Sequence, residues 1–259
     1  MNIAVATSLF SQSNFNPFLT ISYAEEKKIP AIQFYMSENI QKNEKTIHKI
    51  RELCEKKSIK ILCHSPLYTG NVSRNKEHCT ALSEIFISGN SKYCIFHFDE
   101  NNDVNVMVDD CETLASFSII PCIENYYQNK TKSGLINNIK KYLSFFDRII
   151  QKNIPAIPVL DFPRLFVEQF INFHPNFLSK LLIREFTNQK IIMHMIDSVS
   201  PCQNRENWCA VGKGIVAYSN IFECIKRFNV SVEYAVLEYE NTCFVEESVK
   251  NLNTLIEQK

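Results

Sequence analysis

Short runs of apolar and β-branched residues recur along the chain, and a longer stretch of mixed polarity separates each run from the next. Nearly every position of a run is apolar, which is typical of a strand buried on both faces. Such strands in alternation with helices indicate a parallel sheet joined by crossover helices. The eight predicted strands are Asn2–Thr7, Ala31–Tyr35, Ile59–Cys63, Tyr93–Phe96, Ser118–Ile123, Ile154–Leu160, Lys190–Met193 and Val232–Leu237.

The stretches between these runs carry apolar residues at helical spacing, with polar residues on the opposite face. We therefore expect a helix in each of them. The predicted helices are Glu38–Lys57, Asn75–Ser88, Ser133–Gln151, Pro163–Phe186, Ala217–Phe228 and Glu246–Glu257, and two less regular patterns favour helices at Phe18–Lys28 and Val106–Ala115.

The number and order of these elements predict an α/β protein with a (β/α)8 TIM barrel. A chain of 259 residues has the usual size of such a barrel. It contains only five glycines and no Ser- or Pro-rich linker, so we expect residues 1–259 to form a single domain. A doubly wound open sheet gives the same alternation, but the residues after the first strand, Ala6-Thr7-Ser8-Leu9-Phe10, lack the glycine-rich phosphate loop usual in that fold.

Charge and composition narrow the range of partners. Lys plus Arg and Asp plus Glu each total 28, so the formal net charge is zero and no global field attracts nucleic acid. The N-terminus has no basic residue before its apolar stretch, and no apolar window approaches the ~18 residues of a membrane span. We expect a cytoplasmic protein that does not contact a membrane; the sequence does not predict its oligomeric state.

The ten cysteines are scattered, and none forms a Cys-x-x-Cys pair. Several lie inside apolar runs, so we interpret them as reduced core residues. Side-chain alternation along a strand predicts that Cys63, just before His64, points away from the barrel mouth. For Cys122, two positions before Glu124, the direction stays open.

Residues with nitrogen or oxygen donors stand at the ends of six successive predicted strands. The C-terminal strand ends of a barrel converge on one mouth, so these side chains are expected to meet there. Three imidazoles and three carboxylates without a thiolate suit Zn, Mn, Fe or Co, whereas Mg and Ca prefer oxygen ligands only. The candidate metal ligands are His64, His97, Glu124, Asp161, His194 and Glu238.

The sequence around these residues resembles the xylose isomerase-like TIM barrel superfamily, which includes endonuclease IV and the sugar phosphate isomerases and epimerases. The resemblance spans nearly the whole chain and implies the same barrel. It rests on His64-Ser65-Pro66, Phe96-His97-Phe98, Ile123-Glu124-Asn125, Leu160-Asp161-Phe162, Met193-His194-Met195-Ile196-Asp197, Gly212-Lys213-Gly214 and Leu237-Glu238.

Similarity to endonuclease IV implies two of that family's three zinc sites. The ligands of one site match His64, His97 and Glu124, and those of a second match Glu124, Asp161, His194 and Glu238, with Glu124 bridging. Three ligand positions of the third zinc read Arg164, Glu206 and Trp208 instead. The resemblance thus implies one or two divalent ions.

Similarity to the ketose 3-epimerases implies a single metal with four ligands, Glu124, Asp161, His194 and Glu238. The two glutamates would also serve as the catalytic acid/base pair. The Pro and the second Glu that usually follow the first Glu in that family are Asn125 and Lys130 here, and Ser200 replaces an expected cationic residue.

These comparisons leave two functions open. As an isomerase or epimerase, the protein would use the metal to polarise a carbonyl of a small sugar, sugar phosphate or related hydroxy-carbonyl substrate, while Glu124 and Glu238 move a proton at the neighbouring carbon. As an endonuclease IV-like phosphodiesterase with fewer metals, it would bind nucleic acid, which needs a basic surface that a neutral chain offers poorly.

Three residues near the predicted mouth are candidate substrate-binding residues. Arg164 could clamp an anion or form a salt bridge to Glu206. Trp208, the only Trp, could stack on a sugar or simply pack. Lys213 in the Gly-Lys-Gly sequence could hold a phosphate or carboxylate, or lie in a plain turn.

Asp197, three residues after His194, is a candidate partner that orients this imidazole. An exposed loop acid is the alternative.

Overall fold

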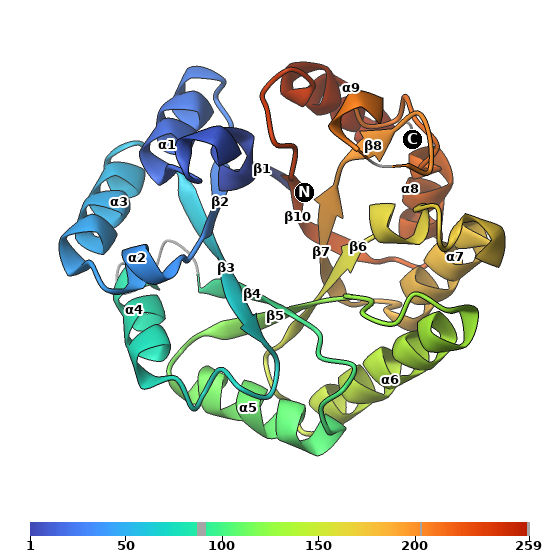
Figure 1. The fold of residues 1–259 in the computed structure, drawn as a ribbon, viewed down its shortest axis with the longest axis horizontal. Coiled ribbons are helices and arrows are strands. Elements are labelled where there is room, and N and C mark those ends of the chain that lie inside the picture. The colour runs from blue at the N-terminus through green and yellow to red at the C-terminus, as the bar shows by residue number, and fades with distance from the viewer. Residues whose placement is uncertain (87–91, 203, 258–259) are drawn as a thin grey trace.

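Eight parallel strands close into a barrel in this computed structural model, which describes residues 1–86, 92–202 and 204–257 (Figure 1). Around the barrel the order is β1-β10-β7-β6-β5-β4-β3-β2. The closed barrel confirms the predicted (β/α)8 fold class. Its strands are β1 (Asn2–Ala6), β2 (Ala31–Tyr35), β3 (Lys60–Tyr68), β4 (Tyr93–His97), β5 (Ile120–Glu124), β6 (Ile157–Asp161), β7 (Lys190–Met195) and β10 (Ser231–Leu237).

Helices form an outer ring around these strands (Figure 1). Between β7 and β10 the chain adds a two-stranded antiparallel sheet of β8 (Asp197–Ser198) and β9 (Trp208–Cys209). No helix among the described residues is long and apolar enough to cross a membrane. The helices are α1 (Pro17–Glu26), α2 (Glu38–Gln41), α3 (Glu44–Lys56), α4 (Lys76–Phe86), α5 (Val104–Ser116), α6 (Lys132–Gln151), α7 (Pro175–Glu185), α8 (Tyr218–Arg227) and α9 (Val245–Glu257), with 3-10 turns η1 (Thr7–Ser13), η2 (Pro163–Leu165), η3 (Ile171–Phe173) and η4 (Arg205–Asn207).

Short polar side chains begin several of these helices. The side chain of Asn16 accepts a hydrogen bond from the backbone N–H of Phe18 at 2.9 Å at the start of α1. Asp103 and Thr131 do the same for α5 and α6. Each cap satisfies an amide that the helix itself leaves unpaired.

Two predicted helices are wrong in extent. The stretch Glu38–Lys57 breaks between α2 and α3 because Asn43 caps the second helix, accepting from the backbone N–H of Thr46 at 3.0 Å. In Pro163–Phe186 only α7 is an α-helix: it begins at Pro175, whose missing N–H suits a first helical position and no later one. Of the helix predicted for Asn75–Ser88, α4 covers Lys76–Phe86, and residues 87 and 88 lie outside the described residues.

The barrel interior is filled by a small apolar cluster that lies directly beneath the predicted ligands. Successive side chains of a strand point to opposite faces, so residues two apart share the interior. Leu62 therefore lies two positions below His64, and Cys122 two below Glu124. The other strands follow the same pattern, and the interior cluster comprises Ala4, Ala6, Ala31, Leu62, Ile95, Cys122, Ile157, Val159, Ile192, Tyr234 and Val236.

A larger apolar core lies between the barrel and the helices, and Cys63 belongs to it, as alternation predicts. All ten cysteines are free, and six of them are buried. The interpretation as core residues therefore holds for these six, whereas Cys202 and Cys243 are exposed and do not belong to the core.

Candidate metal centre

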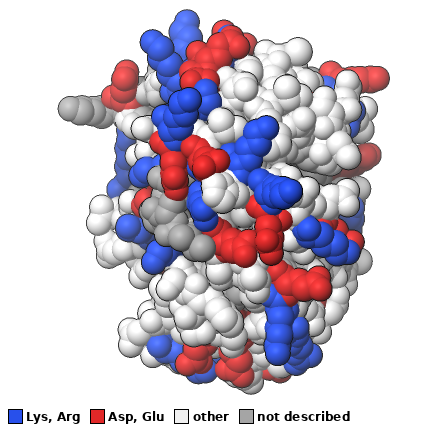
Figure 2. Space-filling model, turned by 90° about the vertical axis from the view of Figure 1, so that its left-hand side faces the viewer, with Lys and Arg blue, Asp and Glu red and all other residues white. Residues whose placement is uncertain are grey.

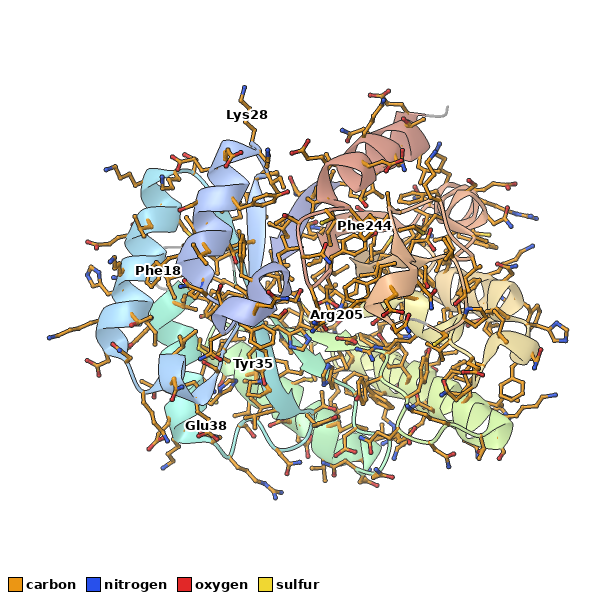
Figure 3. All side chains as sticks on the ribbon, turned by 45° about the horizontal axis from the view of Figure 1, so that its top comes forward. Phe18, Lys28, Tyr35, Glu38, Arg205 and Phe244 are labelled. Atoms are coloured by element: carbon orange, nitrogen blue, oxygen red, sulfur yellow. The ribbon has the colours of Figure 1, made fainter. Side chains whose placement is uncertain are left out.

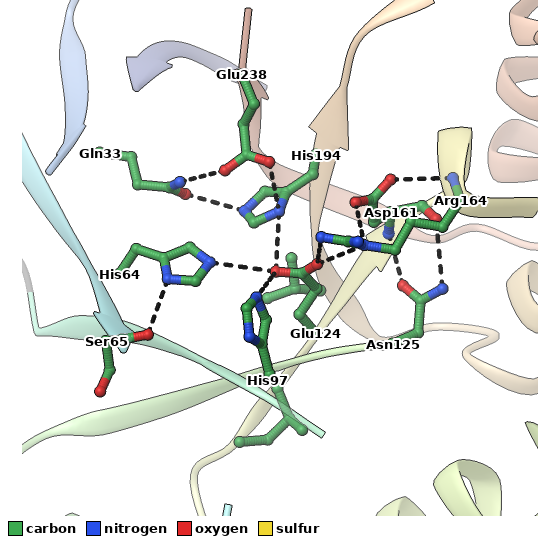
Figure 4. Close-up of polar contacts among 12 residues, drawn as sticks. Gln33, His64, Ser65, His97, Glu124, Asn125, Asp161, Arg164, His194 and Glu238 are labelled. Carbon is green, nitrogen blue, oxygen red and sulfur yellow. Dashed lines mark hydrogen bonds and ion pairs between the residues drawn. The ribbon is translucent and has the colours of Figure 1, made fainter. Parts of the chain in front are cut away.

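The six predicted ligands come together at the C-terminal end of the barrel (Figure 4). The strand register brings neighbours level: His97 pairs with Glu124, and Asp161 with His194. Among the described residues, three sets have ligand atoms within 4.8 Å of one another, and each set suits a metal ion. These sets are His64, His97 and Glu124; His64, His194 and Glu238; and Glu124, Asp161 and His194.

Glu124 lies at the centre of the cluster, and its side chain is completely buried. One carboxylate oxygen, Oε2, faces three imidazoles. It lies 3.3 Å from Nε2 of His64, 3.5 Å from Nε2 of His97 and 3.2 Å from Nδ1 of His194. Imidazole nitrogens gathered around a carboxylate form a donor set that fits a divalent transition metal.

Gln33 on β2 fixes which nitrogen of His194 faces this cluster. The side-chain amide of Gln33 donates to Oε1 of Glu238, and its oxygen lies 2.9 Å from Nε2 of His194. An ionised carboxylate only accepts, so Nε2 of His194 must donate to the Gln33 oxygen. In the neutral ring, Nδ1 then carries a lone pair directed at the cluster.

This Nδ1 atom is buried and makes no hydrogen bond of good geometry within the described part of the chain. It lies 3.2 Å from an oxygen of Glu124 and 3.2 Å from one of Glu238. With Nδ1 unprotonated, lone pairs on all three atoms would oppose one another; a proton on Nδ1 or a cation among the three atoms removes this repulsion. The residues therefore fit a metal ion.

Gln33 was not predicted as a site residue. It is the one polar residue in the apolar run 31–35, and it occupies an inward-facing position two after Ala31. That combination is the sequence signal that could have identified it.

Charges within the cluster shift its titrations strongly. Burial alone would lower the pKa of His194, but the carboxylates of Glu238 and Glu124 raise it to about 9. Burial lowers the pKa of His97 to about 4, against the opposing effect of Glu124. Burial would raise the pKa of Glu124, yet Arg164, His194 and His97 hold it well below its usual range. The carboxylates thus attract positive charge, which a divalent cation would supply.

Arg164 contacts two of the predicted ligands. Its Nη2 and Nε atoms lie 2.8 and 2.9 Å from Oε1 of Glu124, and Nε lies 2.6 Å from Oδ2 of Asp161. The guanidinium also packs over the ring of Tyr126, 4.6 Å from its centroid. The alternative partner from the sequence, Glu206, is exposed in η4.

A pocket of about 270 Å3 opens beside His64 and His97. It exposes part of Glu238, whose side chain is 23% exposed, whereas Glu124 is buried below it. Trp208, predicted to bind substrate, lies in the lining. At the pocket edge Glu240 forms an ion pair with Arg205. Figure 3 shows Arg205 and the lining residue Tyr35 toward the middle of the molecule. The lining comprises Ala6, Thr7, Ser8, Phe15, Gln33, Tyr35, His64, His97, Trp208, Glu238 and Glu240.

The chain is similar to solved structures over nearly its whole length, although no family model and no curated protein matches its sequence. An IOLI protein with a binding zinc atom has 12% identity and a TM-score of 0.70, with 100% of this chain and 99% of that chain covered. A xylose isomerase domain protein from Planctomyces limnophilus has 11% identity and a TM-score of 0.66, with 98% and 95% covered. A D-psicose 3-epimerase from Clostridium cellulolyticum H10, with D-tagatose, has 11% identity and a TM-score of 0.60, with 92% and 85% covered.

The chain has the xylose isomerase-like barrel fold. This confirms the fold that the sequence motifs imply. Because one fold supports many reactions, the reaction has to be argued from the residues of the site.

The Gly-Lys-Gly loop is organised by Asp197. This buried carboxylate accepts from the backbone N–H groups of Gly212 and Gly214 at 2.9 Å each, and from that of Val216 at 3.2 Å. Asp197 is therefore not an exposed loop acid, and among the described residues its carboxylate bonds to loop amides instead of His194. The loop amides that could bind an anion already have an acceptor, and Lys213 is exposed and outside the pocket lining. A substrate contact of Lys213 stays a prediction.

Proposed function

We propose that this protein is a metal-dependent isomerase or epimerase that moves a proton at a carbon next to a carbonyl of a small hydroxy-carbonyl substrate. The observation that carries the proposal is the position of Glu238. This carboxylate is partly exposed in a pocket of sugar size and at the same time borders the histidine cluster. A base beside a metal-binding donor set is what carbon-acid chemistry requires.

The six predicted ligands provide donors for one or two divalent ions, such as Zn, Mn, Fe or Co. When bound, such a cation polarises the substrate carbonyl and acidifies the neighbouring C–H bond. Glu238 accepts the proton, and the Gln33 amide, which donates to Oε1 of Glu238, holds this carboxylate in place. Glu124, predicted as the second member of the acid/base pair, is buried beneath the histidines, so we assign it first to holding the cation.

The pocket lining supports an uncharged substrate. Among the described residues it contains two carboxylates, Glu238 and Glu240, and neither Lys nor Arg. The two arginines nearby already pair with carboxylates. Phe15, Tyr35 and Trp208 offer apolar rings to the C–H face of a sugar and exclude water. We therefore propose a free sugar or polyol ketone, rather than a sugar phosphate, as the substrate class.

The endonuclease IV-like phosphodiesterase remains the alternative, because the histidine-surrounded Glu124 also fits a carboxylate that bridges two metals. Binding to nucleic acid is a partner prediction of this alternative only. The acidic pocket lining opposes it. Figure 2 shows basic and acidic side chains interspersed over the helices on one side of the barrel, rather than a basic track.

Hydrogen exchange tests the proposal. In deuterated water with added Zn2+, Mn2+ or Co2+, the protein should label a carbon next to the carbonyl of at least one ketose in a panel of free sugars, observed by NMR. Glu238→Gln should abolish labelling because the proton acceptor is lost. Glu233→Gln is the matched control: it lies on the same strand, β10, where it pairs with Lys190 instead of the cluster. No labelling of any sugar, together with metal-dependent nicking of abasic DNA, would overturn the proposal in favour of the alternative.

A further inference from the structure

The two oxygens of Glu124 face different cations. Oε2 faces the three imidazoles, whereas Oε1 receives Nη2 and Nε of Arg164. Asp161 binds the same guanidinium: its Oδ2 lies 2.6 Å from Nε of Arg164, and its Oδ1 accepts from the Arg164 backbone N–H at 3.3 Å. The carboxylate cluster therefore has a histidine side and an arginine side (Figure 4).

Arg164 occupies one of the three donor sets. The set Glu124, Asp161 and His194 shares both of its carboxylates with the guanidinium. Within the described part of the chain, Arg164 forms its side-chain hydrogen bonds and ion pairs with Glu124 and Asp161, not with the set His64, His194 and Glu238. A metal ion in the first set would share its two carboxylates with the guanidinium, whereas an ion in the second would not.

The arrangement holds Arg164 firmly in this position. Its backbone lies in the η2 turn directly after β6, and its guanidinium packs over Tyr126. The side chain of Asn125 accepts from the backbone N–H of Asp161 at 2.6 Å, which fixes the end of the strand. Burial alone would lower the pKa of Arg164, but the carboxylates of Asp161 and Glu124 raise it above its usual value. The guanidinium therefore stays charged.

Charge balance favours a single metal ion beside this arginine. With the three imidazoles neutral, as they are when they bind a metal ion, the ionised carboxylates of Glu124, Asp161 and Glu238 carry three negative charges. Arg164 balances one of them, and a single divalent ion balances the other two. A second divalent ion would leave a surplus of positive charge in a largely buried site, which is costly.

We propose that the guanidinium of Arg164 takes the place of a second metal ion. The centre then holds one divalent ion on the histidine side, and Asp161 pairs with Arg164 instead of binding the ion. This inference rests on the proposed metal-dependent function. According to the inference, the site binds one metal ion, whereas the sequence left one or two open, and Asp161 is not a metal ligand.

Metal counting with Co2+ tests this role. Protein stripped with a chelator is titrated with Co2+, and stoichiometry is measured by calorimetry and by the visible absorption of bound cobalt. Wild type should bind one ion. Arg164→Gln should bind two, because two carboxylates lose their internal cation. Asp161→Asn should still bind one. Arg184→Gln, which removes an exposed arginine that pairs with Glu185, is the matched control and should bind one.

The outcomes separate this inference from the proposed function. The role of Arg164 would be overturned by two ions in wild type, by one ion in Arg164→Gln, or by no ion in folded Asp161→Asn. None of these outcomes would contradict the proposed metal-dependent function. Absence of any ion in wild type would overturn the proposed function and the inference with it. If Arg164→Gln fails to fold, wild type and Asp161→Asn still decide, because each gives a stoichiometry of its own.

Discussion

Glu124 and Glu238 approach the same nitrogen of His194: one oxygen of each carboxylate lies 3.2 Å from Nδ1. The two glutamates come from β5 and from the residue after β10, and β6 and β7 stand between these strands in the barrel. His194 thus contacts a carboxylate from each of these two parts of the barrel.

Replacement of His194 should disable the metal centre. In His194→Ala a buried imidazole donor is lost, and only water could fill the vacancy. We expect metal affinity to fall by more than about 100-fold, beyond the usual loss when a residue that only supports a ligand is removed. Metal content after dialysis, measured by mass spectrometry, checks this. His48→Ala is the control, since His48 is exposed on α3; equal metal content in both variants would contradict the prediction.

Gln33 should act as a positioning residue for Glu238 and His194. Gln33→Leu keeps the approximate volume of the side chain but removes both hydrogen bonds. We expect metal affinity to fall by about 10- to 100-fold, the range typical for loss of a residue that orients ligands. Isothermal titration with Zn2+ measures the change, and Gln151→Leu, at the exposed end of α6, provides the control. Unchanged affinity in Gln33→Leu would show that the cluster does not depend on this amide.

Buried His78 should make stability depend on pH. Its Nε2 lies 2.8 Å from Oγ of Ser65, and burial lowers its pKa to about 4. The unfolded chain, with a His pKa of about 6.5, binds the proton first as pH falls. This contribution to stability is therefore complete above about pH 6.5 and is lost progressively toward pH 4, by about 2 kcal/mol between pH 7.5 and 5.

Urea unfolding of wild type and His78→Gln at these two pH values tests that linkage. The difference in unfolding free energy between the two proteins should shrink at pH 5, because the variant lacks this titration. His48→Gln, an exposed replacement, should not reproduce the effect. A difference that stays the same at both pH values would contradict the prediction.

The loop at 212–214 should be sensitive at Gly214 and tolerant at Lys213. A Cβ added to Gly214 would collide with the Asp197 carboxylate and with the backbone oxygen of Ser198. Gly214→Ala should therefore cost about 1–3 kcal/mol of stability. Lys213→Ala removes an exposed side chain and should stay within about 0.5 kcal/mol of wild type. Thermal unfolding checks both; a rise in KM for Lys213→Ala at unchanged stability would support the predicted substrate contact.

Much of the fold can be predicted from the sequence, because the strands of a barrel are apolar throughout and their side chains alternate with a period of two. The runs that end in His64, His97 and Glu124 correspond to β3, β4 and β5, with boundaries shifted by a few residues. The missed helix breaks also had local signals, Asn43 as a cap and Pro175 as a first helical residue. Helical periodicity continues across both breaks, so it does not reveal them by itself.

What the sequence determined by itself is the set of donors and their common side: parallel strands must present their C-terminal ends together, so six donors at six strand ends converge. Only the tertiary structure decided how these donors divide. That Gln33 bridges Glu238 and His194, that Arg164 turns to Glu124 and Asp161 instead of Glu206, and that Asp197 folds a loop all depend on contacts between distant segments. Such contacts follow from barrel register and from competition among buried charges, because each buried carboxylate takes the nearest cation or amide that the packed chain brings to it.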